Sequence, residues 1–292
     1  YNNNCSTPSN NGGLYLLNVA DVLNPKQLAL AQYPTNGYRW AGYNSVAMSV
    51  DGKNAYVANS QQELQIFDAS ILTSLNMLSR TSTTCQALSV LPSLNSKNVF
   101  VGTSCNNIIQ FNITDAVKPT ISKIIDTKTQ PQNELTISPD EKLLAFRSQV
   151  FDISSGLPTL DISSIVSSPL AIAFIENKKA LIVNQNSLTM IDLEKPQETT
   201  SQIPLSFSST ASCCSTPVSL KYIASSKVAY LVYGGELKVI DMADITHPVV
   251  RGSIILPEPP NGYNNSHTGV VVSSDGAIIY AVYKGSVIVI HT

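Results

Sequence analysis

The stretch LKVIDMADITHP (237–248) combines a short run of mostly apolar residues, an aspartate, and a turn-like tail that ends in proline. The run predicts a strand that stops at Asp241, because aliphatic and β-branched residues favour strands whereas Asp and Pro favour their ends. An aspartate in this place, six residues before His247, could act as an acid, bind a metal or cap a turn. The rest of the chain decides between these interpretations.

The same pattern recurs seven times along the 292 residues. The copies occupy residues 14–25, 64–70, 108–119, 148–158, 188–196, 237–248 and 287–292. The residues that correspond to Asp241 are Asn18, Asp68, Asn112, Asp152, Asp192, Asp241 and His291, at intervals of 40–50 residues. A recurrence with this period is typical of repeat proteins.

Each interval between two copies contains a predicted β-hairpin, and a further apolar segment follows each of the first six copies. The hairpins span residues 45–59, 87–104, 133–148, 169–185, 217–233 and 268–283. We name the hairpin strands A and B, the strand that ends at the Asp or Asn C, and the strand after it D. No stretch of useful length has helical periodicity, so the chain is predicted to be nearly all β.

Four strands that repeat every 40–50 residues predict the blade of a β-propeller. The predicted fold class is all-β, a β-propeller of six to seven four-stranded blades whose end blades can be incomplete. We expect residues 1–13 to be a polar N-terminal segment and residues 14–292 to be a single β-propeller domain. The repeated C strand, followed by Ser or Thr, Asp and Pro, resembles the LVIVD-repeat family of propeller proteins. That resemblance implies a β-propeller fold and a role in binding at the cell surface or outside the cell.

The ends of the predicted repeat do not make whole blades. The strand order is C–D, then five A–B–C–D units, then A–B–C, and the polar residues 1–13 cannot supply the missing hairpin. A six-bladed ring could close by pairing the N-terminal D strand, or C and D together, with the C-terminal hairpin, which leaves one C strand surplus. Otherwise the chain is part of a longer sequence, or each incomplete blade is completed by another chain, since an open sheet edge accepts an added strand. Completion between chains would run head to tail and would build a filament.

The recurrence favours a turn cap over an acid for Asp241. Asn replaces Asp twice and His replaces it once, which a general acid or a metal ligand would tolerate poorly. An Asp or Asn side chain can instead accept hydrogen bonds from backbone N–H groups two or three residues on. The three histidines have no partner at ligand spacing. No catalytic residue, metal or cofactor is therefore assigned, and the sequence leaves enzymatic activity open while favouring its absence.

The cysteines bear on the compartment, because a disulfide would imply an oxidising one, and the glycosylation motifs permit an extracellular location. Cys85 begins strand A and Cys105 ends strand B of one hairpin, so we expect a disulfide between them. Cys213 and Cys214 are adjacent in a polar loop, and one of them could pair with Cys5. Sequons for N-glycosylation begin at Asn4, Asn112 and Asn264. The expected location is extracellular or at the cell surface.

The composition of the chain indicates which classes of binding partner to expect. Charged residues make up 13% of the chain, the formal net charge is -2, and the 18 Lys and Arg residues are scattered, so nucleic acid is not an expected partner. No apolar run reaches the length that a membrane-spanning helix needs. We therefore expect protein partners or further copies of the chain, with carbohydrate as a further option.

Two long loops between D and A strands, 33–45 and 256–269, contain the most suggestive surface residues. Both include Asn-Gly-Tyr, and aromatic residues beside arginine are typical of binding hot spots. The candidate binding residues are Tyr38, Arg39, Trp40, Tyr43, Tyr263 and His267. The alternative is that these rings plug the central channel or cover a blade edge.

The sequence thus predicts a non-catalytic extracellular β-propeller that is a protein-interaction or structural module and can assemble head to tail by strand complementation. The alternative is a propeller enzyme, or a small-ligand or carbohydrate binder, with its site at the channel mouth. Such a site needs converging carboxylates, His or Arg, whereas the inward residues of the A strands are expected to be mainly apolar. These residues are Val46, Met48, Leu88, Ile137, Ile172 and Val271.

Overall fold

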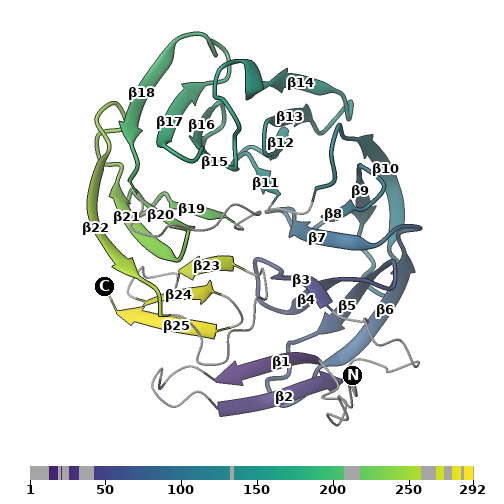
Figure 1. Ribbon diagram of the computed structural model, residues 1–292. Coiled ribbons are helices and arrows are strands. Elements are labelled where there is room, and N and C mark those ends of the chain that lie inside the picture. Colours follow the sequence, from purple (N-terminus) through teal and green to yellow (C-terminus); the bar gives the residue numbers. More distant parts are fainter. Residues whose placement is uncertain are drawn as a thin grey trace, which may run out of the picture. The chain divides into compact units, whose positions relative to one another are not determined.

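The structure is a computed structural model (Figure 1), and it describes most of the chain. The described residues are 13–18, 21, 26–32, 43–131, 135–206, 218–257, 268–272, 278–283 and 286–291. The chain divides into two compact units, Tyr1–Gln132 and Asn133–Thr292, and each is described by itself.

Unit 1 contains three antiparallel sheets, in which neighbouring strands follow one another along the chain (Figure 1). The first sheet has two strands, β1 (Gly13–Asn18) and β2 (Lys26–Gln32). The second has four, β3 (Tyr43–Met48), β4 (Asn54–Asn59), β5 (Glu63–Asp68) and β6 (Asn76–Ser82). The third also has four, β7 (Ala87–Pro92), β8 (Asn98–Thr103), β9 (Asn107–Asn112) and β10 (Thr120–Asp126).

Unit 2 contains four further sheets of the same kind. Three of them have four strands. The first consists of β11 (Thr136–Ile137), β12 (Leu143–Phe146), β13 (Gln149–Asp152) and β14 (Pro158–Asp161), and the second of β15 (Ala171–Glu176), β16 (Lys179–Val183), β17 (Ser187–Asp192) and β18 (Thr199–Pro204). The third consists of β19 (Ser219–Ile223), β20 (Val228–Tyr233), β21 (Glu236–Asp241) and β22 (Val249–Ile255). The last has three: β23 (Thr268–Val272), β24 (Ile278–Tyr283) and β25 (Ser286–His291). A 3-10 turn, η1 (Ile162–Ser164), is the one helical element among the described residues.

The predicted strand order is confirmed over the described part of the chain. One C–D pair is followed by five A–B–C–D sheets and by one A–B–C sheet. In the four-stranded sheets the B and C strands are buried on both of their faces, because within each unit a sheet packs against its neighbour along the chain. In unit 1, Tyr56, Ile66, Val101 and Phe111 belong to one such cluster between the β3–β6 and β7–β10 sheets. Burial of side chains of this size contributes about 1.5–3 kcal/mol each to folding.

The D strands share an irregularity. In all six C–D pairs the register shifts by one residue near the middle of the ladder, as a β-bulge does. A bulge increases the local twist and turns the outer edge away from a flat template. The repeat therefore includes a device that limits unwanted pairing of its outer strands.

A buried serine closes the A–B turn in three consecutive sheets. The Ser49 hydroxyl donates to Asp51 Oδ1 (2.6 Å) and accepts from the N–H of Asn54 (2.9 Å). The same two bonds recur at Ser93, Asn95 and Asn98 and at Ser138, Asp140 and Leu143.

A disulfide joins Cys85, just before β7, to Cys105, just after β8, with 5.9 Å between their Cα atoms. It lies at the open end of the A–B hairpin, where a ladder brings the two chain segments together. The bond closes a loop of 20 residues, which in the chain-entropy description restricts the unfolded state by about 3 kcal/mol. Cys5, Cys213 and Cys214 lie outside the described residues, so their predicted pairing stays a prediction.

Candidate interaction surfaces

In five of the C strands that the structure describes, the Asp or Asn at the end of the strand caps the turn into the D strand. Asp68 Oδ1 accepts a hydrogen bond from the N–H of Ser70 (2.9 Å), and Asp241 Oδ1 accepts one from the N–H of Ala243 (2.8 Å). Equivalent bonds join Asn112 to Thr114, Asp152 to Ser155 and Asp192 to Glu194. The turn-cap interpretation is confirmed at these five positions.

Asp241 and His247 do not form an acid–base pair. His247 Nδ1 lies 3.1 Å from Asp244 Oδ2, whereas Asp241 Oδ2 is held by the guanidinium of Arg251. The Ala243 N–H, and then Arg251, lower the pKa of Asp241 below its ordinary value of 3.8. Its carboxylate is therefore ionised at neutral pH and cannot donate a proton.

We expect the carboxyl of Asp152 to titrate far below an ordinary aspartate. Hydrogen bonds from the Ser154 hydroxyl, then from the Ser155 backbone N–H and hydroxyl, lower its pKa from 3.8 to about 2. Because the folded-state pKa is depressed, the stabilisation is complete above pH 3.8 and is lost as the pH falls through about 2. The 13C shift of the labelled carboxyl group reports the midpoint directly.

The control for this titration is the Ser154→Ala, Ser155→Ala double variant, in which the Asp152 midpoint should rise towards 3.8. A wild-type midpoint at or above that value would contradict the turn geometry.

Most of the predicted binding residues lie outside the described residues. This applies to Tyr38, Arg39, Trp40, Tyr263 and His267. Tyr43 is the first residue of β3, where its backbone is opposite Asn59 of β4. The aromatic-loop surface therefore stays a prediction, and so does its alternative as packing.

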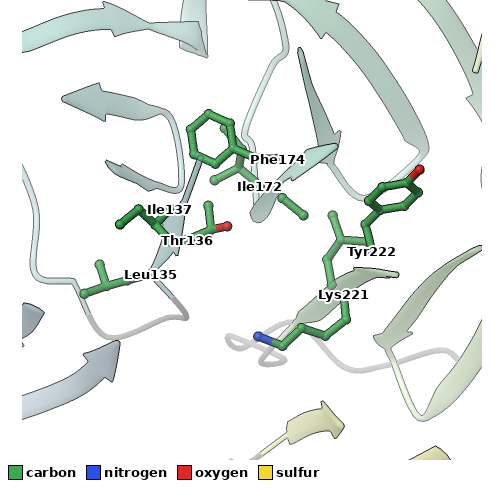
Figure 2. A pocket seen from close by; sticks show the side chains of 9 residues that line it. Leu135, Thr136, Ile137, Ile172, Phe174, Lys221 and Tyr222 are labelled. Carbon is green, nitrogen blue, oxygen red and sulfur yellow. The ribbon is translucent and has the colours of Figure 1, made fainter. Parts of the chain in front are cut away.

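The inner A strands of unit 2 border a small pocket of about 170 Å³ between β11, β15 and β19. Figure 2 shows side chains from these three strands around it, with Lys221 and Tyr222 projecting in different directions from β19. Six of its nine lining residues are apolar, including Ile137, Ile172 and Phe174, but more of the surface that faces the pocket is polar than apolar. Ligand pockets usually measure about 300–1,000 Å³, so only a small molecule would fit here.

The A-strand residues differ in exposure. Ile172 is buried and Leu88 and Ile137 are half-buried, whereas Val46, Met48 and Val271 are exposed.

No group of three or more His, Cys, Asp or Glu side chains suited to a metal ion occurs within the described ranges. None of the helical structure described is long and apolar enough to cross a membrane.

Unit 1 exposes large apolar residues at the turns along one edge of its two four-stranded sheets. In an antiparallel sheet the A–B and C–D turns share an edge. The two A strands begin side by side, because the side-chain amide of Asn44 at the start of β3 donates a hydrogen bond to the carbonyl of Ala87 at the start of β7 (2.7 Å). The turns of the two sheets therefore lie along the same edge. The exposed residues are Val50, Ile71, Leu72, Leu94 and Val117, with exposed fractions of 49–66%. We call these five residues the turn surface.

Comparison with known proteins decides the fold. The chain matches no protein-family model and no curated protein. It is similar to a chain in the crystal structure of a mitotic checkpoint complex, with 14% identity, a TM-score of 0.71, and coverage of 96% of this chain and 85% of that chain. It is also similar to the C-terminal WD40 domain of Sif2, with 10% identity, a TM-score of 0.64, and coverage of 93% and 87%. The chain folds as a β-propeller.

The sheets are therefore blades. Over the described residues, five blades have four strands, and the β23–β25 blade has strands A to C. Six blades thus contain an A–B hairpin, whereas the β1–β2 sheet consists of strands C and D alone. The prediction of a propeller with incomplete end blades is therefore confirmed for the described residues, because the first sheet has two strands and the last has three.

Proposed function

We propose that this β-propeller is a non-catalytic protein-interaction module. The observation that carries the proposal is the turn surface, Val50, Ile71, Leu72, Leu94 and Val117, which exposes five large apolar side chains on one edge of two neighbouring blades. Turn tips are usually polar, and apolar residues grouped on a rigid scaffold are typical of contacts between proteins. The similarity to a chain of a multiprotein complex agrees with this use of the fold.

The experiment compares proteins retained by the immobilised wild-type chain with those retained by an Ile71→Asp, Leu72→Asp variant. Both residues are exposed, so the substitutions should leave the fold intact and remove the apolar contact. The matched control is Leu157→Asp, which changes an equally exposed leucine in another blade. We expect the variant to lose partners that the control keeps. Equal partner sets for all three chains would contradict the proposal.

We further propose that the protein is extracellular or displayed at the cell surface and belongs to the LVIVD-repeat propellers. The Cys85–Cys105 disulfide supports the location, because such bonds persist in oxidising compartments. Asn112 is exposed, so its sequon is accessible to glycosylation. Mass spectrometry of the protein from its native source should find the linked cysteines and a glycan on Asn112. Free thiols at both cysteines would argue against this location.

The mode of self-association that we propose is head-to-tail assembly by strand complementation. Each terminal sheet supports it separately. β1 pairs with β2 along one edge, and β25 pairs with β24 along one edge. In the part of the chain that the structure describes, no strand pairs with the other edge of either. Such edges are templates for a strand from another molecule.

A small-ligand binder is the second candidate, because the residues that line the pocket between β11, β15 and β19 include Lys221 and Thr136. Its volume of about 170 Å³ is below that of most ligand sites, which favours the interaction module. If the pocket is the functional site, Lys221→Ala should abolish binding of an anionic small molecule. The Leu72→Asp substitution in the turn surface should then have no effect on binding of that molecule.

A further inference from the structure

Asn112 combines a structural task with a modification motif, and the two use different atoms. It begins the Asn-Ile-Thr sequon and is exposed at the end of β9. Its side-chain oxygen Oδ1 accepts the N–H of Thr114 (2.9 Å), which caps the C–D turn. N-glycosylation modifies the side-chain nitrogen Nδ2, which this bond leaves unused. The other two sequons, at Asn4 and Asn264, lie outside the described residues.

The nitrogen of Asn112 is not held by the rest of the blade. At the corresponding place in β21, the second oxygen of Asp241 is bound by Arg251 of β22. In β10 the residue that matches Arg251 in the bulge is Ser122, whose hydroxyl donates instead to the Gln110 carbonyl (3.0 Å). No hydrogen bond joins Asn112 Nδ2 to any residue that the structure describes. A glycan on this atom would therefore break no hydrogen bond of the folded blade.

Asn112 lies between the two turns that the β7–β10 blade contributes to the turn surface. In the ladders it is opposite Asn98, just after the A–B turn, and opposite Thr120, just after the C–D turn. The A–B turn contains Leu94 and the C–D turn contains Val117, and both side chains are exposed. An N-linked glycan is bulky and polar. On Asn112 it would stand next to both of these apolar side chains.

The side chain of Asn112 points away from the neighbouring β3–β6 blade. Phe111, the residue before it, packs in the cluster that this blade shares with β7–β10. Successive side chains of a strand point to opposite faces, so Asn112 is on the other face. A glycan there borders the turn surface on the side away from the β3–β6 blade. The turn-surface residues of that blade are Val50, Ile71 and Leu72.

We propose that an N-linked glycan on Asn112 covers Leu94 and Val117 and leaves Val50, Ile71 and Leu72 as the part of the turn surface that proteins contact. This rests on the proposed interaction module and on its proposed extracellular location. The donor is a lipid-linked oligosaccharyl diphosphate. A bond forms between Asn112 Nδ2 and C1 of the first sugar, the bond from C1 to the diphosphate oxygen breaks, the lipid diphosphate leaves, and the amide loses one proton to the transferase.

The test uses the full chain secreted by a eukaryotic host that attaches N-glycans. Hydroxyl-radical footprinting with mass spectrometry is applied before and after a peptide N-glycosidase removes the glycan. This enzyme leaves a carboxylate at position 112, which still accepts the Thr114 N–H as Asp does in other blades. Labelling of Leu94 and Val117 should rise about twofold or more, because a bulky group no longer covers them. Labelling of Ile71 and Leu72 should stay the same.

Two variants separate the glycan from the turn itself. Thr114→Ala removes the sequon and keeps the backbone N–H that bonds Asn112, so it should be labelled like the deglycosylated protein. Thr114→Ser preserves the sequon and should be labelled like the wild type. Leu157, an exposed leucine in another blade, is the internal control for labelling. Thermal melting checks that both variants fold.

A third variant moves the modification to the neighbouring blade. Asp68→Asn completes a sequon with Ser70 at the same C–D position and retains an oxygen for the Ser70 N–H. Its additional glycan should lower the labelling of Ile71 and Leu72 about twofold or more, because these residues follow in the same turn.

Two outcomes would overturn this inference: an unmodified Asn112 in the secreted wild type, or equal labelling of Leu94 and Val117 with and without the glycan. Neither outcome bears on the interaction module, which is judged by the Ile71→Asp, Leu72→Asp variant. If that variant retains the same partners as the wild type while the glycan still protects Leu94 and Val117, the interaction module fails and the glycan remains as a cover.

Discussion

Glu236→Ala should lower the free energy of unfolding by about 3–5 kcal/mol, because it removes one half of a buried ion pair. Glu236 and Lys238 are neighbours on one face of β21, and Lys238 Nζ donates to Glu236 Oε1 at 2.8 Å. Their side chains are only 3% and 7% exposed. Without the carboxylate, the ammonium stays in a poorly solvated site where its charge is costly. Equilibrium unfolding in urea measures the loss.

The control is Glu194→Ala, which breaks the exposed Lys178–Glu194 pair and should cost about 0–1 kcal/mol. The double variant Glu236→Leu, Lys238→Met removes both charges and keeps apolar volume. It should be neutral or more stable than the wild type by about 1–4 kcal/mol. A cost for Glu236→Ala as small as that of the control would show that the pair is well solvated.

Phe111→Ala should also lower the free energy of unfolding by about 3–5 kcal/mol, because it leaves a cavity in a packed cluster. Phe111 is fully buried in β9, where it packs in the cluster that contains Tyr56, Ile66 and Val101. The loss combines the transfer of the ring to water with the cavity that remains. Urea unfolding, followed by far-UV circular dichroism, measures it.

Phe111→Leu retains most of the apolar volume and should cost less than about 1.5 kcal/mol. Val117→Ala, at an exposed turn of the same blade, should change stability by no more than about 0.5 kcal/mol. If Phe111→Ala resembled Val117→Ala, the cluster would not be a packed core.

The repeated pattern allowed most of the strands to be predicted. The apolar alternation, the turn residues and the 40–50-residue period are local signals, and they predicted the order of strands that the structure contains. The turn-cap interpretation of Asp241 also followed from recurrence, since an Asx turn depends only on residues next to it in the chain. The hydrogen bonds by which a buried serine closes the A–B turn were not predicted, because serine is common throughout this chain and its presence in a turn does not show what its hydroxyl contacts.

The ion pair in β21 could not be predicted from its own segment. Glu236 and Lys238 alternate with apolar residues, a pattern that normally indicates one solvated face of a strand. In the structure both faces are covered, so the polar face is buried and its two charges pair. Neighbouring blades, rather than the local sequence, determine that burial.

By itself, the sequence determined the repeat, the strands within it and the residues that cap its turns, because hydrogen-bonded turns and strand propensities act over a few neighbouring residues. The tertiary structure alone decided which of these residues are exposed. The exposure of the turn surface of unit 1 and the burial of Glu236 and Lys238 in β21 depend on whether a neighbouring blade supplies atoms against them. Burial is a property of contacts between segments far apart in the chain, so the candidate interaction surfaces appeared only when the blades were placed side by side within each unit.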